Sequence, residues 1–91
     1  MIVVELGVQQ GAPLTTRPPW SRRIADEITD LITSGRWRPG RQLPSTSRLA
    51  EQYGVSEATA YRAVRELHRR GLVVGERGRG VYVADPTHPI G

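Results

Sequence analysis

The residues of this 91-residue chain with the clearest chemical potential are arginines that recur along one stretch, Arg62, Arg65 and Arg69. At about 100° per residue, these three fall on one side of a helix together with Ala58 and Tyr61. A guanidinium group binds phosphate or a guanine edge through a planar pair of donors, and a small residue such as Ala can approach a thymine methyl closely. The pattern favours contact with nucleic acid over the ordinary alternative, a solvated charged face.

A second pair of arginines lies in Arg77-Gly78-Arg79, inside a glycine-rich run at 75–80. Glycine makes such a loop flexible enough to follow the wall of a DNA groove, where guanidinium groups bind phosphates or enter the minor groove. An ordinary solvent-exposed turn is the alternative. All thirteen basic residues are Arg and none is Lys. Because a coding bias of the source genome would also produce this, only the positions of the arginines favour DNA.

Three helices are expected to position these side chains. Aliphatic residues spaced by three or four predict the first helix at 20–34. Ser45 and Ser56 are N-cap candidates for a second helix at 46–53 and a third at 57–70, and a glycine follows each helix. The third helix is expected to pack inward through Ala60, Ala63, Val64 and Leu67. Two short helices joined by a tight turn and backed by another form a helix-turn-helix, whose second member enters the major groove.

Two β-prone runs, 72–74 and 81–83, predict a hairpin whose tip is the glycine-rich run. The fold class is therefore mainly α with a small β-hairpin: a winged helix-turn-helix with three helices plus a wing. We assign residues 20–84 to this domain. Residues 1–19 are expected to form an N-terminal tail or a short strand, and residues 85–91 a C-terminal tail.

Composition excludes several other classes of function. The absence of cysteine rules out disulfides, thiolate metal sites and cysteine nucleophiles. No apolar run approaches the roughly 20 residues of a membrane span, and the opening residues lack the basic leader of a signal peptide. The glycines do not follow nucleotide-binding spacing, and the two histidines have no partners at metal-ligand spacing. We expect a cytoplasmic protein that is not an enzyme and that carries no metal, cofactor or membrane anchor.

The first helix contains three acidic residues, Asp26, Glu27 and Asp30. They could imitate a catalytic pair, but their spacing near a helix start is explained by compensation of the helix dipole and by pairing with Arg22 and Arg23. No catalytic role is assigned to them.

A series of short motifs runs through the predicted domain: Ile24…Ile28…Ile32-x-x-Gly35, Pro39-Gly40-x-x-Leu43-Pro44-Ser45, Leu49-Ala50, Tyr53-Gly54-Val55-Ser56, Thr59, Ala63-Val64, Leu67, Gly71-Leu72-Val73 and Gly78-x-Gly80-x-x-Val83. This series resembles the DNA-binding domain of the GntR (gluconate-repressor-like) family of bacterial transcription regulators. The resemblance implies a winged helix-turn-helix that binds double-stranded DNA, with residues 57–70 in the major groove and the wing at 75–80 on the backbone or in the minor groove. Full-length members usually add a C-terminal domain that binds a small effector and forms the dimer. No effector domain is expected in this chain, which is either a naturally short member or a truncated one.

Three positions depart from the family's usual pattern. Where the family often has Arg, this chain has Ser47, with Arg48 beside it, and also Glu57 and Tyr61. A glutamate near the groove repels phosphate, although it can accept a hydrogen bond from N4 of cytosine and so confer specificity. The residues expected to contact DNA are Ser45, Ser47, Arg48, Ser56, Glu57, Ala58, Thr59, Tyr61, Arg62, Arg65, Arg77, Gly78 and Arg79.

We therefore expect sequence-specific binding to double-stranded DNA by a bacterial transcriptional regulator. One such module buries only about 600 to 1,000 Å² of surface, so a homodimer on DNA is also expected. The alternative is a winged-helix protein–protein interaction module without DNA binding, which would turn the same arginine face to an acidic partner. A third and weaker alternative is a binder of single strands, but the chain lacks the aromatic stacking platform that such proteins use.

Overall fold

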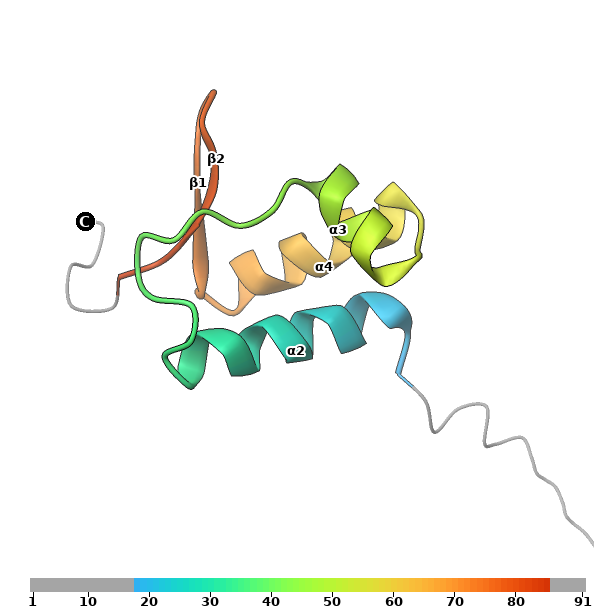
Figure 1. The fold of residues 1–91 in the computed structure, drawn as a ribbon, viewed down its shortest axis with the longest axis horizontal. Coiled ribbons are helices and arrows are strands. Elements are labelled where there is room, and N and C mark those ends of the chain that lie inside the picture. The colour runs from blue at the N-terminus through green and yellow to red at the C-terminus, as the bar shows by residue number, and fades with distance from the viewer. Residues whose placement is uncertain (1–17, 86–91) are drawn as a thin grey trace, which may run out of the picture.

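The computed structural model describes residues 18–85, which form three helices followed by a two-stranded hairpin (Figure 1). In chain order the elements are α2 (Trp20–Thr33), α3 (Thr46–Tyr53), α4 (Glu57–Arg69), β1 (Val73–Glu76) and β2 (Gly80–Val83). The expected mainly α fold with a small β-hairpin is confirmed. The expectations for residues 1–17 and 86–91, which cover nearly all of the two tails, lie outside the described residues.

Helix α2 begins directly after Pro19 and ends at Thr33, one residue before the predicted end. Pro19 occupies the N-cap position with an extended backbone and makes no side-chain cap hydrogen bond. The helix forms because Ile24 and Ile28, four residues apart, are both fully buried against the rest of the domain. Its stability therefore comes from tertiary packing of one face rather than from its ends.

Helices α3 and α4 begin at serine N-caps, as the sequence predicts. Ser45 Oγ accepts a hydrogen bond from the Arg48 N–H at 3.1 Å, and Ser56 Oγ accepts one from the Thr59 N–H at 3.1 Å. Each bond satisfies an N–H group that the first helical turn leaves without a partner. Gly54 ends α3 at φ +66°, a left-handed conformation that glycine adopts without strain. The connection to α4 is therefore a tight helix-turn-helix turn.

The strands of the hairpin extend further toward the tip than predicted. β1 begins at Val73 and continues to Glu76, opposite Gly80 of β2, so the turn contains only residues 77–79. The predicted tip at 75–80 was too long because glycine is unfavourable in strands on average. Here pairing with the backbone of the opposite strand outweighs the unfavourable strand preference of glycine.

The segment that precedes α3 pairs with the outer edge of β2. The N–H of Leu43 donates to the carbonyl of Val81 at 2.8 Å, and the N–H of Val83 donates to the carbonyl of Arg41 at 2.8 Å. Pro44 disfavours a helical conformation of the residue before it, which accounts for the extended segment, but no sequence pattern predicts its partner. This pairing connects the wing directly to the start of the helix-turn-helix.

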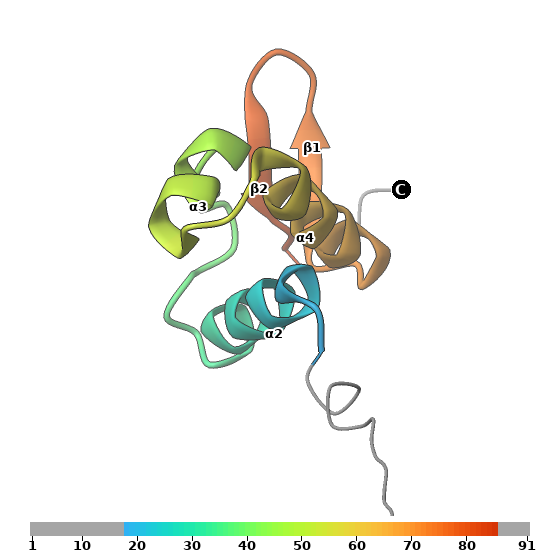
Figure 2. The same cartoon turned by 90° about the vertical axis from the view of Figure 1, so that its right-hand side faces the viewer.

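One hydrophobic core lies between the three helices and the base of the hairpin. Its largest fully buried side chains are Ile24 and Ile28 of α2, Leu49 of α3 and Leu67 of α4. Each contributes roughly 1.5–3 kcal/mol through burial. Figure 2 shows α2 below α4, α3 to the side of α4, and the hairpin above α4. The core therefore fixes how α4 is presented.

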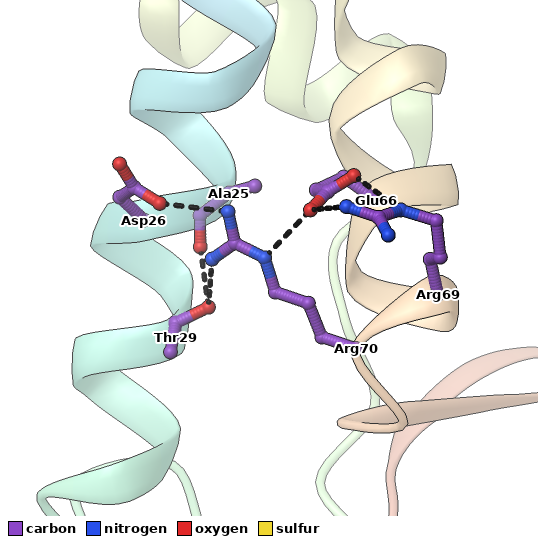
Figure 3. Close-up of polar contacts among 6 residues, drawn as sticks. All are labelled: Ala25, Asp26, Thr29, Glu66, Arg69 and Arg70. Carbon is purple, nitrogen blue, oxygen red and sulfur yellow. Dashed lines mark hydrogen bonds and ion pairs between the residues drawn. The ribbon is translucent and has the colours of Figure 1, made fainter.

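A charged link joins the end of α4 to α2 (Figure 3). Arg70 donates to Asp26 Oδ1 at 2.8 Å and to Thr29 Oγ1 at 2.9 Å across the interface, and to Glu66 Oε2 at 2.9 Å on its own helix. The expected pairing of Asp26 with arginines of its own helix is therefore wrong. Helical spacing finds neighbours three or four residues apart, but Arg70 is 44 residues away in sequence.

Candidate nucleic-acid interface

Helix α4 separates a buried aliphatic side from an exposed side. The buried residues, each at most 6% exposed, are Ala60, Ala63, Val64 and Leu67. On the other side Tyr61 is 56% exposed, and Ala58, Arg62 and Arg65 are exposed as well. The division of α4 that the helical pattern predicts is therefore confirmed, and two arginines and a tyrosine are free to contact a partner.

The other elements with candidate residues, α3 and the hairpin, lie next to α4 on the side of the molecule away from α2 (Figure 2). Figure 1 shows the hairpin projecting beyond the helices. In this arrangement one helix of the pair can enter a DNA groove, while the hairpin can follow the wall of the groove as a wing. The buried faces of α2 and α4 hold this arrangement in place.

Two candidate residues contact each other at the start of the helix pair. The Ser47 hydroxyl donates to Glu57 Oε2 at 3.1 Å and so joins the first turn of α3 to the first turn of α4. Both side chains are exposed. Two of the positions at which the chain departs from the expected arginines are thus brought together, and no sequence pattern predicts this contact.

Serine side chains cap the first turns of α3 and α4. Ser56 Oγ donates to Thr59 Oγ1 at 3.0 Å in addition to accepting from the Thr59 backbone, so both hydroxyls already have a structural role. Arg48 is exposed in the first turn of α3 and lines a shallow hollow with Ser45 and Gln42. The positive ends of the helix dipoles make these first turns suitable for a phosphate.

The tip of the wing carries the second pair of arginines, and a residue outside the wing fixes it. Arg77 and Arg79 are exposed, and the Arg79 guanidinium forms a long ion pair with Glu76, at 3.9 Å. Gly78, between the arginines, has φ +76°, which suits glycine. The side-chain amide of Gln42 donates to the carbonyl of Arg79 at 2.8 Å. The role of Gln42 is not predicted from the sequence, because only the pairing of its segment with β2 brings it to the tip.

Arg69 and Arg70, at the end of α4, are less free than Arg62 and Arg65. Arg69 donates through Nε to Glu66 Oε1 at 3.0 Å and through Nη2 to Glu66 Oε2 at 2.8 Å. Hydrogen bonds from Arg69 and Arg70 lower the pKa of Glu66 from 4.5 to about 2, so this carboxylate is ionised at neutral pH. The positive charge of α4 that is free to bind a partner is therefore that of Arg62 and Arg65.

The part of the chain that the structure describes, residues 18–85, contains no group of three or more His, Asp or Glu side chains placed to hold a metal ion. It also contains no helix long and apolar enough to span a membrane.

Comparison with known proteins gives a consistent result. Residues 20–83 match the family described as "Bacterial regulatory proteins, gntR family". The chain is 39% identical over 74 residues to the histidine utilization repressor of Klebsiella aerogenes, covering 81% of this chain and 31% of the repressor. It is 43% identical over 68 residues to the histidine utilization repressor of Pseudomonas aeruginosa, covering 75% of this chain and 27% of that protein. The chain thus spans about a third of the length of these relatives.

Solved structures show the same fold. The DNA-binding domain of AraR in complex with operator ORX1 has a TM-score of 0.72 and 30% identity, covering 85% of this chain and 93% of the AraR domain. YtrA from Sulfolobus acidocaldarius, a GntR-family transcription factor, has a TM-score of 0.72 and 35% identity, covering 79% of this chain and 76% of YtrA. Residues 20–83 are a winged helix-turn-helix domain, and the chain belongs to the gntR family of bacterial regulatory proteins.

Proposed function

We propose that this chain binds double-stranded DNA sequence-specifically as part of a transcriptional regulator. The observation that carries the proposal is the exposed side of α4, on which Tyr61, Arg62 and Arg65 are free while the opposite side is buried. A helix presented in this way fits the major groove, where arginine binds guanine through two hydrogen bonds. Such a protein works where the chromosome is, which in bacteria is the cytoplasm.

The relatives support the same function. The two histidine utilization proteins similar to this chain are repressors, and the similar AraR domain is bound to operator DNA. The family is one of regulatory proteins, and we assign no enzymatic activity.

The thirteen candidate residues divide into three proposed roles. Bases are proposed to be contacted by Ser47, Arg48, Glu57, Ala58, Tyr61, Arg62 and Arg65. Backbone phosphates are proposed to bind at the capped helix starts, at Ser45, Ser56 and Thr59. The wing residues Arg77, Gly78 and Arg79 are proposed to bind phosphate or to enter the minor groove.

Titration with duplex DNA of random sequence at several salt concentrations tests the proposal. Each phosphate that the protein neutralises should contribute about −0.9 to the slope of log affinity against log salt. Arg62→Ala combined with Arg65→Ala should reduce the affinity strongly. Arg36→Ala combined with Arg38→Ala is the matched control, because both arginines are exposed but follow α2 rather than lying on α4.

The main alternative is a protein-interaction module that uses the same arginines. If the wild-type chain shows no measurable affinity for duplex DNA at low salt, the DNA-binding proposal is refuted and an acidic protein partner is favoured. Preference for single-stranded over duplex DNA in a direct competition would also refute the proposal.

A further inference from the structure

Glu57 is the first residue of α4, and its carboxylate is held at one oxygen. Oε2 accepts the hydrogen bond from Ser47 at 3.1 Å, and the side chain is exposed. No hydrogen bond to Oε1 is found within residues 18–85. Glu57, Tyr61 and Arg65 follow one another at intervals of four, so they lie along one edge of the helix. Glu57 Oε1 is therefore a hydrogen-bond acceptor at the start of the helix edge on which the exposed Tyr61 and Arg65 lie.

No arginine balances the charge of the Glu57 carboxylate among the described residues, in contrast to the carboxylates of Glu66 and Glu76. Glu66 is bonded to two arginines, and Glu76 forms an ion pair with Arg79. The partner of Glu57 is a neutral hydroxyl, and no ion pair to it is found among the described residues. Compensation of the helix dipole accounts for an acid in a first helical turn, but it does not require a bond to a different helix.

The four bases differ in the hydrogen-bonding groups that they present to a carboxylate held in a fixed position. In the major groove cytosine presents the N4 amino donor, guanine and thymine present acceptors that repel a carboxylate, and adenine presents a donor beside an acceptor. We propose that Glu57, oriented by Ser47, reads a cytosine, so that the target DNA has a C·G pair facing the first turn of α4. This inference rests on the proposed DNA binding and specifies one base pair of the target sequence.

Selection of bound sites from random duplex DNA, followed by titration of the four bases at the selected position, tests the inference. The wild-type chain should prefer cytosine there by roughly tenfold. Glu57→Ala should remove most of this preference while raising the affinity for DNA in general, because a negative charge is lost. Glu57→Gln should shift the preference from cytosine toward adenine, since glutamine pairs with adenine through two bonds. Ser47→Ala should reduce the preference about threefold.

A matched control separates base reading from a change in net charge. Asp30→Asn also removes one exposed carboxylate, but on α2, and it should leave every base preference as in the wild type. If the wild-type chain binds and selects DNA while the Glu57 variants select the same bases at all positions, the inference is refuted and the proposed function stands. If Ser47→Ala alone has no effect on base preference, orientation by Ser47 is refuted. If the wild type does not bind duplex DNA at all, the proposed function itself has failed.

Discussion

At the scale of single residues, the exposed arginines differ in what they can distinguish. Arg62 lies on a helix that fits the major groove, where each base pair presents its own pattern of donors and acceptors. Arg77 and Arg79 lie at the tip of a hairpin, where phosphates are the nearer partners. Specificity and general affinity should therefore depend on different residues.

Arg62→Ala and Tyr61→Ala are each expected to alter base preference, with about 1–3 kcal/mol of discrimination lost at the position that Arg62 contacts. Arg77→Ala and Arg79→Ala are expected to weaken binding to all sequences similarly and to reduce the magnitude of the salt slope by about 1 each. Titration of a panel of duplexes that differ by single bases measures both effects. A change in the preferred site caused by the wing variants alone would reverse these roles.

Glu66 gives a residue-scale prediction for pH. Its pKa in the folded chain is about 2, below the ordinary 4.5, so the ionised form favours the folded state. This contribution is fully present above about pH 4.5 and is lost as the pH falls from there through 2. Glu66→Gln should therefore lower the melting temperature at pH 6, and the difference from wild type should shrink toward pH 2.

The melting temperatures of the wild type and of Glu66→Gln are measured from pH 6 to pH 2. Glu51→Gln is the control, because Glu51 is an exposed carboxylate of α3 for which no ion pair is found within residues 18–85. A gap between wild type and Glu66→Gln that stays constant from pH 6 to pH 2 would contradict the assignment.

At the scale of elements, the wing depends on the segment that precedes α3. Gln42 donates to the carbonyl of Arg79 at 2.8 Å and belongs to the segment that pairs with β2. Gln42→Ala should release the tip and weaken binding to all DNA sequences by about as much as Arg79→Ala, although it removes no charge. Unchanged affinity, measured in the same titration, would mean that the pairing of the backbone alone is enough to hold the wing.

The link between α2 and α4 gives a second prediction at this scale. Arg70 is only 23% exposed and joins the two helices through Asp26 and Thr29, so Arg70→Ala should cost about 1 kcal/mol in the free energy of unfolding. Arg69→Ala is the matched control, because Arg69 is 74% exposed and binds only within its own helix. Its effect should be much smaller. Equal losses for the two variants in urea unfolding would contradict a role for Arg70 between the helices.

The sequence predicts local features of these elements well and contacts between them poorly. The serine caps, the stop at Gly54 and the buried side of α4 follow from short-range patterns, and the structure confirms them. The contact of Ser47 with Glu57 and that of Gln42 with the wing depend on how separate elements pack. Exposed polar side chains leave no periodic signal that would pair them across such distances.

At the scale of the whole molecule, the domain is small compared with what specific binding requires. A single module of this kind buries about 600 to 1,000 Å² on DNA, and two copies on adjacent half-sites would roughly double that surface. We therefore expect two copies to bind one target, each with its α4 in the major groove. Because the two grooves must face the same side of the duplex, the half-sites should lie about 10 base pairs, or a multiple of this, from centre to centre.

Duplexes with one half-site, with two in-phase half-sites and with five added base pairs between the two test this expectation. The second copy should bind more tightly than the first on the in-phase duplex, and the insertion should remove that advantage because it rotates one half-site by about half a turn. Mobility shifts that count bound copies, together with analytical ultracentrifugation of the free chain, make the measurement. Independent binding to both half-sites at every spacing would show that the copies do not contact each other, and dimerisation would then require the rest of a longer protein.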